Sequence, residues 1–258
     1  MKLIAVVAAA LQLVPVGGGR SLYLSCRGTG TPAVVFDSGL GVYSGTWLAV
    51  QKRVATQTRA CVYDRVGLGT SSPAPPGRTS ADLVADLATL LQRANVAGPY
   101  VLVGASFGGL DVQLFGATHP DDVAGIVLVD SLHWDFDRRI EKLLPTKLAL
   151  QRRDELGLNR ERIFYPQILA SEREVHAALP LPDVPLVVIR HGIPFSTAPG
   201  WPSRAVEQLW LALQNDLANE TPTPGSIVLA ARSGHRIAEQ QPALVAAQVE
   251  HVVAEARK

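Results

Sequence analysis

The sequence predicts an α/β fold, with a mostly parallel, doubly wound sheet and a small helical cap inserted after the sixth strand. Short apolar runs rich in β-branched residues alternate with helix-like stretches, which is the pattern of a parallel sheet covered by helices. The chain has 258 residues, of which 47% are hydrophobic, enough to bury one large core. One domain with an insertion therefore fits the chain better than two independent domains.

The first fourteen residues have two interpretations. Lys2 followed by the apolar run 3–14 is typical of a signal peptide. The same run can instead form a first β-strand, because the glycines at 17–19 lead into the strand-like stretch 21–26 as a hairpin turn would. The run is too short to span a membrane, so we expect no stable membrane span. The compartment, cytoplasmic or exported, stays open.

Six further apolar runs predict the remaining strands, at residues 33–36, 60–63, 100–103, 125–129, 186–189 and 227–230. Residues 80–94 show the i, i+3, i+4 spacing of an amphipathic helix, with Ser80 as its N-cap. Residues 107–118 predict a helix that ends at His119 and Pro120, and residues 242–257 predict a closing helix.

The alternation of strand-like and helix-like runs stops between Ser131 and Asp183, where the sequence is charged and helix-like. An insertion that leaves the carboxyl end of a strand lies where open α/β sheets bind their ligands. We therefore expect residues 131–184 to form a helical cap over the substrate, and residues 1–130 and 185–258 to form the core. An ordinary surface excursion is the alternative.

Charge and composition exclude several classes of function. The 24 basic and 23 acidic residues are spread along the chain, which argues against a nucleic-acid-binding face and an acidic tail. No metal-ligand spacing such as HExxH or paired CxxC occurs, so neither a metal nor a cofactor is expected. A small neutral molecule is the expected partner, and the oligomeric state stays open.

Cys26 and Cys61 are the only cysteines, and both lie in short apolar strands. The usual interpretation of such residues is a small buried hydrophobic side chain. A disulfide is the alternative if the sheet places the two strands side by side, since the geometry of a cross-strand bridge is demanding.

A serine lies on a predicted strand-to-helix turn, in the segment Gly104-Ala105-Ser106-Phe107-Gly108. The pattern GxSxG between a strand and a helix is typical of a nucleophile elbow, which exposes the serine at the edge of the sheet. The sequence therefore predicts Ser106 as a nucleophile. A plain glycine-rich turn is the alternative, because the bare pattern also occurs by chance.

A serine hydroxyl is a weak nucleophile, so it needs a base, and the base needs an acceptor that orients it. Among six histidines, His235 alone sits in a glycine-flanked loop after a late strand, and we expect it to be the base. Asp130 ends the strand 125–129, which places its carboxylate at the same edge of the sheet as Ser106 and His235. We predict that it is the acid.

Other residues near these positions are weaker candidates. Asp135 and Asp137 are alternatives for the acid. After the next strand, the loop that starts at His191 contains no carboxylate before Glu207, which lies well inside a helix-like segment. His133 and His191 follow strands and could line the site, but packing is the simpler interpretation.

The oxyanion of an acyl-transfer reaction needs two backbone donors. The Phe107 N–H, at the start of the helix after the nucleophile, is one candidate. The loop 37–41 follows the strand 33–36, and its glycines let the backbone approach a substrate, so the Leu40 N–H is the second. A simple glycine turn is the alternative. Three tryptophans are expected to pack in the core or cap, with a pocket wall as the alternative: Trp134, Trp201 and Trp210.

The chain resembles the α/β-hydrolase fold superfamily, and within it bacterial serine esterase-like members, over nearly its full length. The stretches that carry the resemblance are FDSGLG at 36–41, CVYDRVGLGTSSP at 61–73, YVLVGASFGGL at 100–110, HPDDVAGIVLVDS at 119–131 and SGHRI at 233–237. The resemblance implies a sheet with a helical cap, a Ser–acid–His triad and no cofactor. Asp64, Arg65, Gly67 and Gly69 match a turn that is usually structural in this family.

The chain departs from the family pattern at two points. The His-Gly that is frequent in the oxyanion loop is Ser38-Gly39 here, and the acid that is common after the penultimate strand is missing. The family tolerates an acid after the preceding strand, which matches Asp130.

We therefore expect a carboxylesterase-like serine hydrolase, which cleaves esters of small to medium, largely apolar substrates through an acyl-enzyme. A lactonase or an aminopeptidase that uses the same triad is the alternative enzyme. A ligand-binding, receptor-like protein with slow turnover is the alternative of a different class, because fold alone does not settle function.

Overall fold

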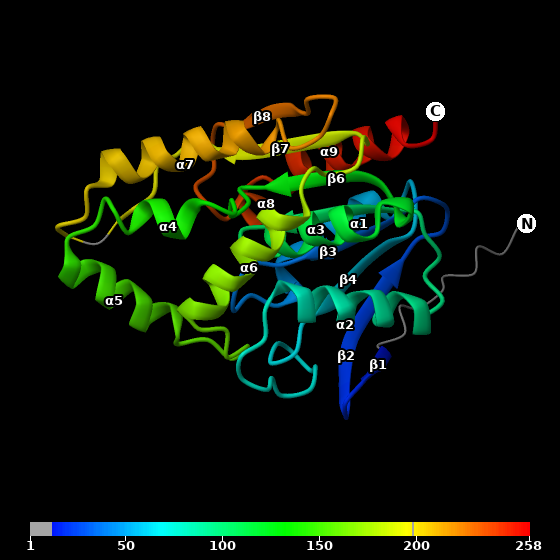
Figure 1. The fold of residues 1–258 in the computed structure, drawn as a ribbon. Helices are drawn as coiled ribbons and strands as arrows, with labels where there is room; N and C mark the ends of the chain where they lie inside the picture. Colours follow the sequence, from blue (N-terminus) through cyan, green and yellow to red (C-terminus); the bar gives the residue numbers. More distant parts are fainter. Residues whose placement is uncertain (1–11, 198) are drawn as a thin grey trace, which may run out of the picture.

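The computed structural model describes residues 12–197 and 199–258, and in these residues eight strands form one mixed sheet (Figure 1). The order across the sheet is β1-β2-β4-β3-β5-β6-β7-β8. Every neighbouring pair from β4 to β8 in this order is parallel, whereas β2 pairs antiparallel with both β1 and β4. The predicted mostly parallel α/β sheet is confirmed.

All six apolar runs that the sequence analysis assigned to strands are strands. The bounds are β1 Gln12–Gly17, β2 Arg20–Arg27, β3 Ala33–Asp37, β4 Ala60–Asp64, β5 Tyr100–Ala105, β6 Val123–Val129, β7 Leu186–His191 and β8 Ser226–Ala230. β1 and β2 form an antiparallel hairpin, so the first-strand interpretation holds from Gln12 onward. Residues 1–11, on which the signal-peptide interpretation depends, lie outside the described residues.

Helices cover both faces of the sheet (Figure 1). One face carries α2 (Ser80–Arg93) and α3 (Phe107–Thr118), and the other carries α1 (Leu48–Val54), α8 (Ile237–Gln240) and α9 (Pro242–Glu255). In β5, Leu102 packs in the core on the α3 side, whereas Val101 and Val103 pack in the core on the α9 side. Both faces of the central strands are therefore buried, which explains their continuous apolar runs.

The start of α2 differs by one residue from the prediction. Ser80 is the first helical residue, and the N-cap is Thr79, whose backbone N–H donates to the Asp82 carboxylate at 3.1 Å. The Ser80 hydroxyl donates instead to Asp111 in the core, at 2.5 Å. The expected N-cap role of Ser80 is therefore wrong, because a buried acceptor engages its side chain.

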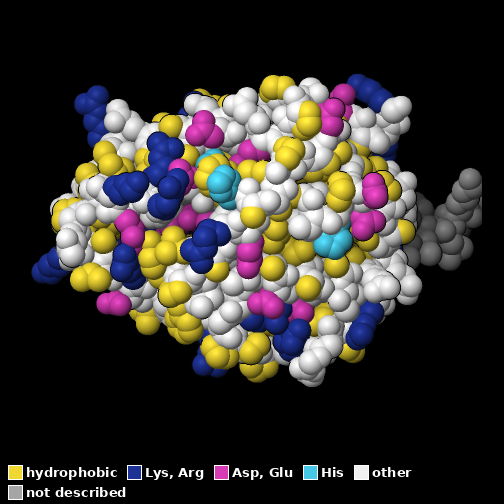
Figure 2. Space-filling model, in the orientation of Figure 1, with side chains coloured by type: hydrophobic (Ala, Val, Ile, Leu, Met, Phe, Trp, Pro, Cys, Tyr) yellow, Lys and Arg dark blue, Asp and Glu magenta, His cyan; other side chains and the backbone are white. Residues whose placement is uncertain are grey.

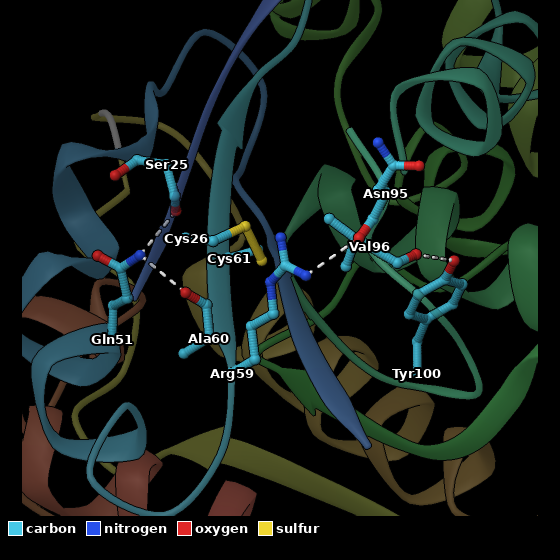
Figure 3. Close-up of a disulfide and its surroundings, with 9 residues drawn as sticks. All are labelled: Ser25, Cys26, Gln51, Arg59, Ala60, Cys61, Asn95, Val96 and Tyr100. Atoms are coloured by element: carbon cyan, nitrogen blue, oxygen red, sulfur yellow. Dashed lines mark hydrogen bonds between the residues drawn. A yellow bond between two sulfur atoms is a disulfide. The ribbon is translucent and has the colours of Figure 1, made fainter. Parts of the chain in front are cut away.

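Cys26 lies directly opposite Cys61 in the β2–β4 pair, and a disulfide joins them (Figure 3). The Gln51 side chain donates to the carbonyl oxygens of Ser25 and Ala60, at 2.8 and 3.0 Å, and so ties α1 to both strands beside the bridge. The hypothesis of a bridge is confirmed, and the interpretation of the two cysteines as free buried side chains is wrong.

Three helices occupy the segment between β6 and β7: α4 (Phe136–Ile140), α5 (Thr146–Leu156) and α6 (Tyr165–Ala178). α6 packs against α3, while α4 contacts α7 (Ser203–Leu217), and α4 and α5 lie beyond the carboxyl ends of β6 and β7 (Figure 1). The division into a core and a cap at residues 131–184 stays a prediction. No helix in the described part of the chain is both long and apolar enough to cross a membrane.

The face of the molecule in Figure 2 carries acidic and basic side chains interspersed with one another, most densely toward the end where α4 and α5 lie. The short 3-10 helices η1 (Ser44–Trp47) and η2 (Pro120–Asp122) complete the fold. η1 follows the loop after β3, where the predicted oxyanion donor Leu40 lies.

Candidate active site

Ser106 stands between β5 and α3 with φ 50° and ψ −121°, a backbone conformation that L-residues rarely adopt. The helix packs so closely here that a Cβ on Gly104 would lie 2.5 Å from the Gly108 carbonyl oxygen. A Cβ on Gly108 would lie 2.5 Å from the Ser38 carbonyl oxygen. The structure therefore contains the sharp strand-to-helix turn that GxSxG predicts, and both glycines are needed for it.

Asp130 follows β6 directly, is fully buried, and lies 2.7 Å from His235, measured from Oδ2 to Nδ1. Burial raises the pKa of Asp130, but hydrogen bonds from His191 and His235 outweigh it and lower the pKa to about 2. The His235 side chain is 36% exposed. The structure thus brings the predicted acid and the predicted base together, with the acid as a buried anion and the base open to solvent.

Ser106 and His235 line the same two cavities, which is where the structure brings them together. Among the hydrogen bonds formed by residues 12–197 and 199–258, none joins the Ser106 hydroxyl to the His235 ring. Catalytic hydrogen bonds are often longer before substrate binds, so this geometry is compatible with a nucleophile and its base. The catalytic roles of all three residues stay predictions.

The alternative acids have partners of their own. Asp135 accepts a hydrogen bond from Arg138 at 2.6 Å, and Asp137 forms an ion pair with Arg152 at 2.6 Å. His133 and Trp134 line a separate cavity that does not include Ser106, and burial lowers the pKa of His133 to about 4. The geometry therefore favours Asp130 over Asp135 and Asp137 as the acid that orients His235.

The predicted oxyanion donors, Leu40 and Phe107, line one of these cavities together with Ser106 and His235. A Cβ on Gly39 would lie only 3.3 Å from the Ser106 Cβ, so the loop after β3 runs close to the elbow. In the described part of the structure, neither the Leu40 nor the Phe107 N–H donates a backbone hydrogen bond. Both donors are therefore available to an oxyanion.

Arg65 holds the loop that carries Leu40. Its guanidinium is 2% exposed and donates to the carbonyl oxygens of Ser38 at 2.5 Å and Gly39 at 2.9 Å. It also bonds both oxygens of Glu161, at 2.6 and 3.2 Å, and forms an ion pair with Asp37. All five guanidinium N–H groups are engaged in this way.

Glu161 completes this arrangement from the segment between β6 and β7. Its Oε2 accepts the Gly41 N–H at 2.6 Å, so side-chain contacts fix the backbone on both sides of Leu40. The family resemblance predicted only a structural turn at Arg65, and no sequence pattern indicated Glu161. No spacing signal could have found it, because 96 residues separate the two partners.

The cavity that holds Ser106, His235 and both oxyanion candidates has a volume of about 350 Å³. Its wall is largely apolar and includes the aromatic side chains Phe107, Phe136, Phe195, Trp201 and Trp210. Two of the three tryptophans therefore line the site, and Trp134 does not. A second cavity of about 550 Å³ also reaches Ser106 and His235 and runs along η1.

Within the described residues, no group of three or more His, Cys, Asp or Glu side chains is arranged to hold a metal ion. The chemistry that the site offers comes from Ser106, a histidine hydrogen-bonded to a buried anion, and backbone N–H groups.

A family model of the alpha/beta hydrolase fold matches residues 32–209. The chain is 26% identical to the uncharacterized protein YqjL of Bacillus subtilis (strain 168), over 85% of this chain and 82% of that protein. It is 38% identical over 109 residues to pimeloyl-[acyl-carrier protein] methyl ester esterase of Chromobacterium violaceum, a match that covers 42% of this chain and 40% of the esterase.

Solved structures share the fold over nearly the whole chain. Alpha/beta hydrolase domain-containing protein 10 from mouse superposes with a TM-score of 0.73 at 18% identity, covering 95% of this chain and 99% of that one. A thermophilic esterase from Thermogutta terrifontis gives a TM-score of 0.65 at 19% identity, covering 96% and 98%. At such identities the likeness shows the fold alone.

Proposed function

This chain belongs to the alpha/beta hydrolase fold family, and on that premise we propose that it is a serine hydrolase that cleaves carboxylic esters of small to medium, largely apolar substrates. The observation that carries the proposal is the 2.7 Å contact between Asp130 and His235 at the cavity that Ser106 lines. A relative named as a methyl ester esterase, 38% identical over 109 residues, supports ester chemistry.

The proposed reaction begins when His235 accepts the proton of the Ser106 hydroxyl and the oxygen attacks the ester carbonyl. Asp130 holds the His235 ring by its Nδ1–H and stabilises the imidazolium that forms. The N–H groups of Leu40 and Phe107 stabilise the oxyanion. His235 then protonates the leaving alcohol, and water cleaves the acyl-enzyme in the reverse sequence of proton transfers.

The cavity indicates which esters fit. A volume of about 350 Å³ accommodates a small to medium acyl or alcohol group, and its aromatic wall favours apolar ones. We propose that α4, α5 and α6 act as a cap that covers this cavity. Each of the three helices contributes a side chain to its lining: Phe136, Leu156 and Ile168. Ser106 and His235 also line the second cavity.

The proposal is tested with a series of p-nitrophenyl esters from acetate to palmitate, on the natural protein and on Ser106→Ala. We expect Ser106→Ala to lower kcat by about 10⁴-fold or more, because the nucleophile is lost. The matched control is Ser226→Ala, which removes an exposed hydroxyl at the start of β8 and leaves turnover unchanged.

A fluorophosphonate probe with peptide mapping identifies the nucleophile directly. Labelling confined to Ser106, together with a chain-length optimum among the esters, supports the proposal and sizes the cavity. Retention of most activity in Ser106→Ala contradicts it. Labelling of Ser106 without turnover of any ester favours an amide, a lactone or a receptor-like role at the same site.

A further inference from the structure

The Asp130 carboxylate accepts four hydrogen bonds, and only one of them comes from His235. Its Oδ2 lies 2.7 Å from Nδ1 of His235 and also 2.7 Å from Nδ1 of His191. Its Oδ1 accepts the indole N–H of Trp210 at 3.0 Å and the backbone N–H of His191 at 3.1 Å. Three of the four hydrogen bonds therefore come from His191 and Trp210, both of which are buried.

His191 is itself held between two carboxylates. It ends β7 with a fully buried side chain, and its Nε2 lies 2.9 Å from Oε1 of Glu207 on α7. A neutral imidazole has one N–H and one lone pair, so it can donate to only one of two anionic oxygens. An imidazolium donates to both, which fits the observed distances.

The surroundings of His191 agree with a positive charge. Burial lowers the pKa of His191, but the hydrogen bonds and charges of Asp130 and Glu207 outweigh it, so the pKa is raised. The other groups packed against the ring are Phe195, edge-on with centroids 4.6 Å apart, and His235, which shares the same Asp130 oxygen.

We propose that His191 is a positioning residue, an imidazolium clamped between Asp130 and Glu207, which aims the Asp130 carboxylate at His235 and places a positive charge beside the His235 ring. The inference rests on the proposed function, because it concerns the same acid and base. The two Nδ1 atoms can be at most twice 2.7 Å apart, since both contact Oδ2 of Asp130. At such a separation two like charges repel strongly even in a partly solvated site.

Glu207 has a second part in this arrangement. Its Oε2 accepts the N–H of Phe195 at 3.2 Å, and Phe195 lines the cavity and packs against both Trp210 and His235. We call Asp130, His191 and Glu207 the clamp. It connects the end of β7 and the start of α7 to the wall of the cavity.

The kinetic test uses His191→Asn, in which the amide N–H keeps a donor near Asp130 and the charge is removed. A base must be neutral to accept the Ser106 proton, and loss of the opposing charge favours protonated His235. We therefore expect the acid limb of the kcat/KM profile to move to higher pH by about one unit, with KM little changed. The control Asp216→Asn removes a charge from α7 without contacting His191, and we expect no shift of this limb.

A direct measurement makes the test independent of turnover. In ¹⁵N-labelled Ser106→Ala protein, the histidine ring spectrum reports whether both nitrogens of His191 carry protons at pH 7.5. We expect both to be protonated, and the second proton to be lost at lower pH in the Ser106→Ala/Glu207→Gln double variant. A neutral His191 ring at pH 7.5, or an unchanged acid limb in a folded His191→Asn protein, overturns the inference. Neither result touches the proposed function, which depends on whether Ser106→Ala abolishes hydrolysis.

Discussion

Two largely buried charge clusters lie on either side of Ser106, and they differ in what their charges can do. The acid cluster consists of Asp130, His191, Glu207 and His235, and the arginine cluster consists of Arg65, Asp37, Glu161 and Asp111. The first contains two histidines, the residue type whose ordinary pKa lies near neutral pH, whereas the second contains a guanidinium, which stays charged. We therefore propose that proton transfer belongs to the acid cluster, whereas the arginine cluster fixes the loop that carries Leu40.

Two aspartates show this difference most clearly, because both are fully buried and their pKa values move in opposite directions. Asp130 accepts four hydrogen bonds, and its pKa is lowered to about 2. Asp111 accepts one from the Ser80 hydroxyl, while its Oδ2 accepts none within the described residues, and burial and the nearby Asp37 charge raise its pKa well above the usual value. Burial raises the pKa of both, so the surroundings decide the direction: hydrogen bonds and charges of His191 and His235 at Asp130, and the like charge of Asp37 at Asp111.

The two shifts act on stability with opposite signs. A lowered pKa means that ionised Asp130 stabilises the fold above the pKa of the unfolded chain, and this contribution is lost as pH falls toward about 2. A raised pKa means that Asp111 costs stability, a cost that is absent in acid, grows as pH rises from the pKa of the unfolded chain to the higher folded pKa, and is constant above it.

The largest expected effect separates these two aspartates by activity. Asp130→Asn removes the anion that orients His235, and we expect kcat to fall by about 10³- to 10⁴-fold. The matched variant Asp111→Asn keeps an acceptor for Ser80 and should change kcat by less than about threefold. Ester hydrolysis and thermal unfolding of both variants check this. Equal losses of activity would show that the two clusters do not differ as we argue.

Arg65→Lys tests the arginine cluster by stability. A lysine ammonium cannot reach both Glu161 and the loop carbonyls at once, so carboxylates are left buried without a partner. We expect the free energy of unfolding to fall by about 3–5 kcal/mol. The control is Arg20→Lys, whose ion pair with Asp86 is partly exposed and should cost about 1 kcal/mol or less. Urea unfolding measures the free energy of unfolding of both variants. Similar losses of stability in the two would contradict the special role of Arg65.

Glu161→Gln sharpens the comparison with a smaller effect. Glu161 accepts three hydrogen bonds from Arg65 and the Gly41 N–H, and the NH2 group that replaces one of its oxygens in glutamine cannot accept any of them. At least one of these bonds is lost, so the loop that carries Leu40 loosens and kcat should fall by about 10- to 100-fold. The acid limb of the pH profile should not move. Glu174→Gln is the control, because that carboxylate also ties α6 to a backbone N–H, that of Ala81 in α2, and forms no hydrogen bond with Arg65 or Gly41. A shift of the acid limb in Glu161→Gln would refute the separation of the two clusters.

Much of the fold could be predicted because its signals are local. Six apolar runs marked their strands, and the glycines around Ser106 marked the sharp turn. The N-cap of α2 was missed by one residue, since Ser80 and Thr79 are both good caps and only the buried Asp111 distinguishes them.

The site could be predicted only in part. The carboxyl ends of parallel strands meet at one edge of the sheet, which is why Asp130 and His235 were correctly expected to lie together. The clamp on Asp130 was not predicted, because nothing in the spacing of His191 and Glu207 shows that both ring nitrogens would face carboxylates. The disulfide stayed one of two interpretations until strand order placed Cys26 opposite Cys61.

The sequence by itself determined the order of strands and helices along the chain, the elbow at Ser106 and the chemical types of the predicted triad, because apolar periodicity and glycine positions act over a few residues. Only the tertiary structure decided which charges share a buried space. Arg65 and Glu161 are 96 residues apart, and their contact follows from how the segment after β6 packs back over the sheet. Burial makes such contacts strong, and sequence spacing does not encode them.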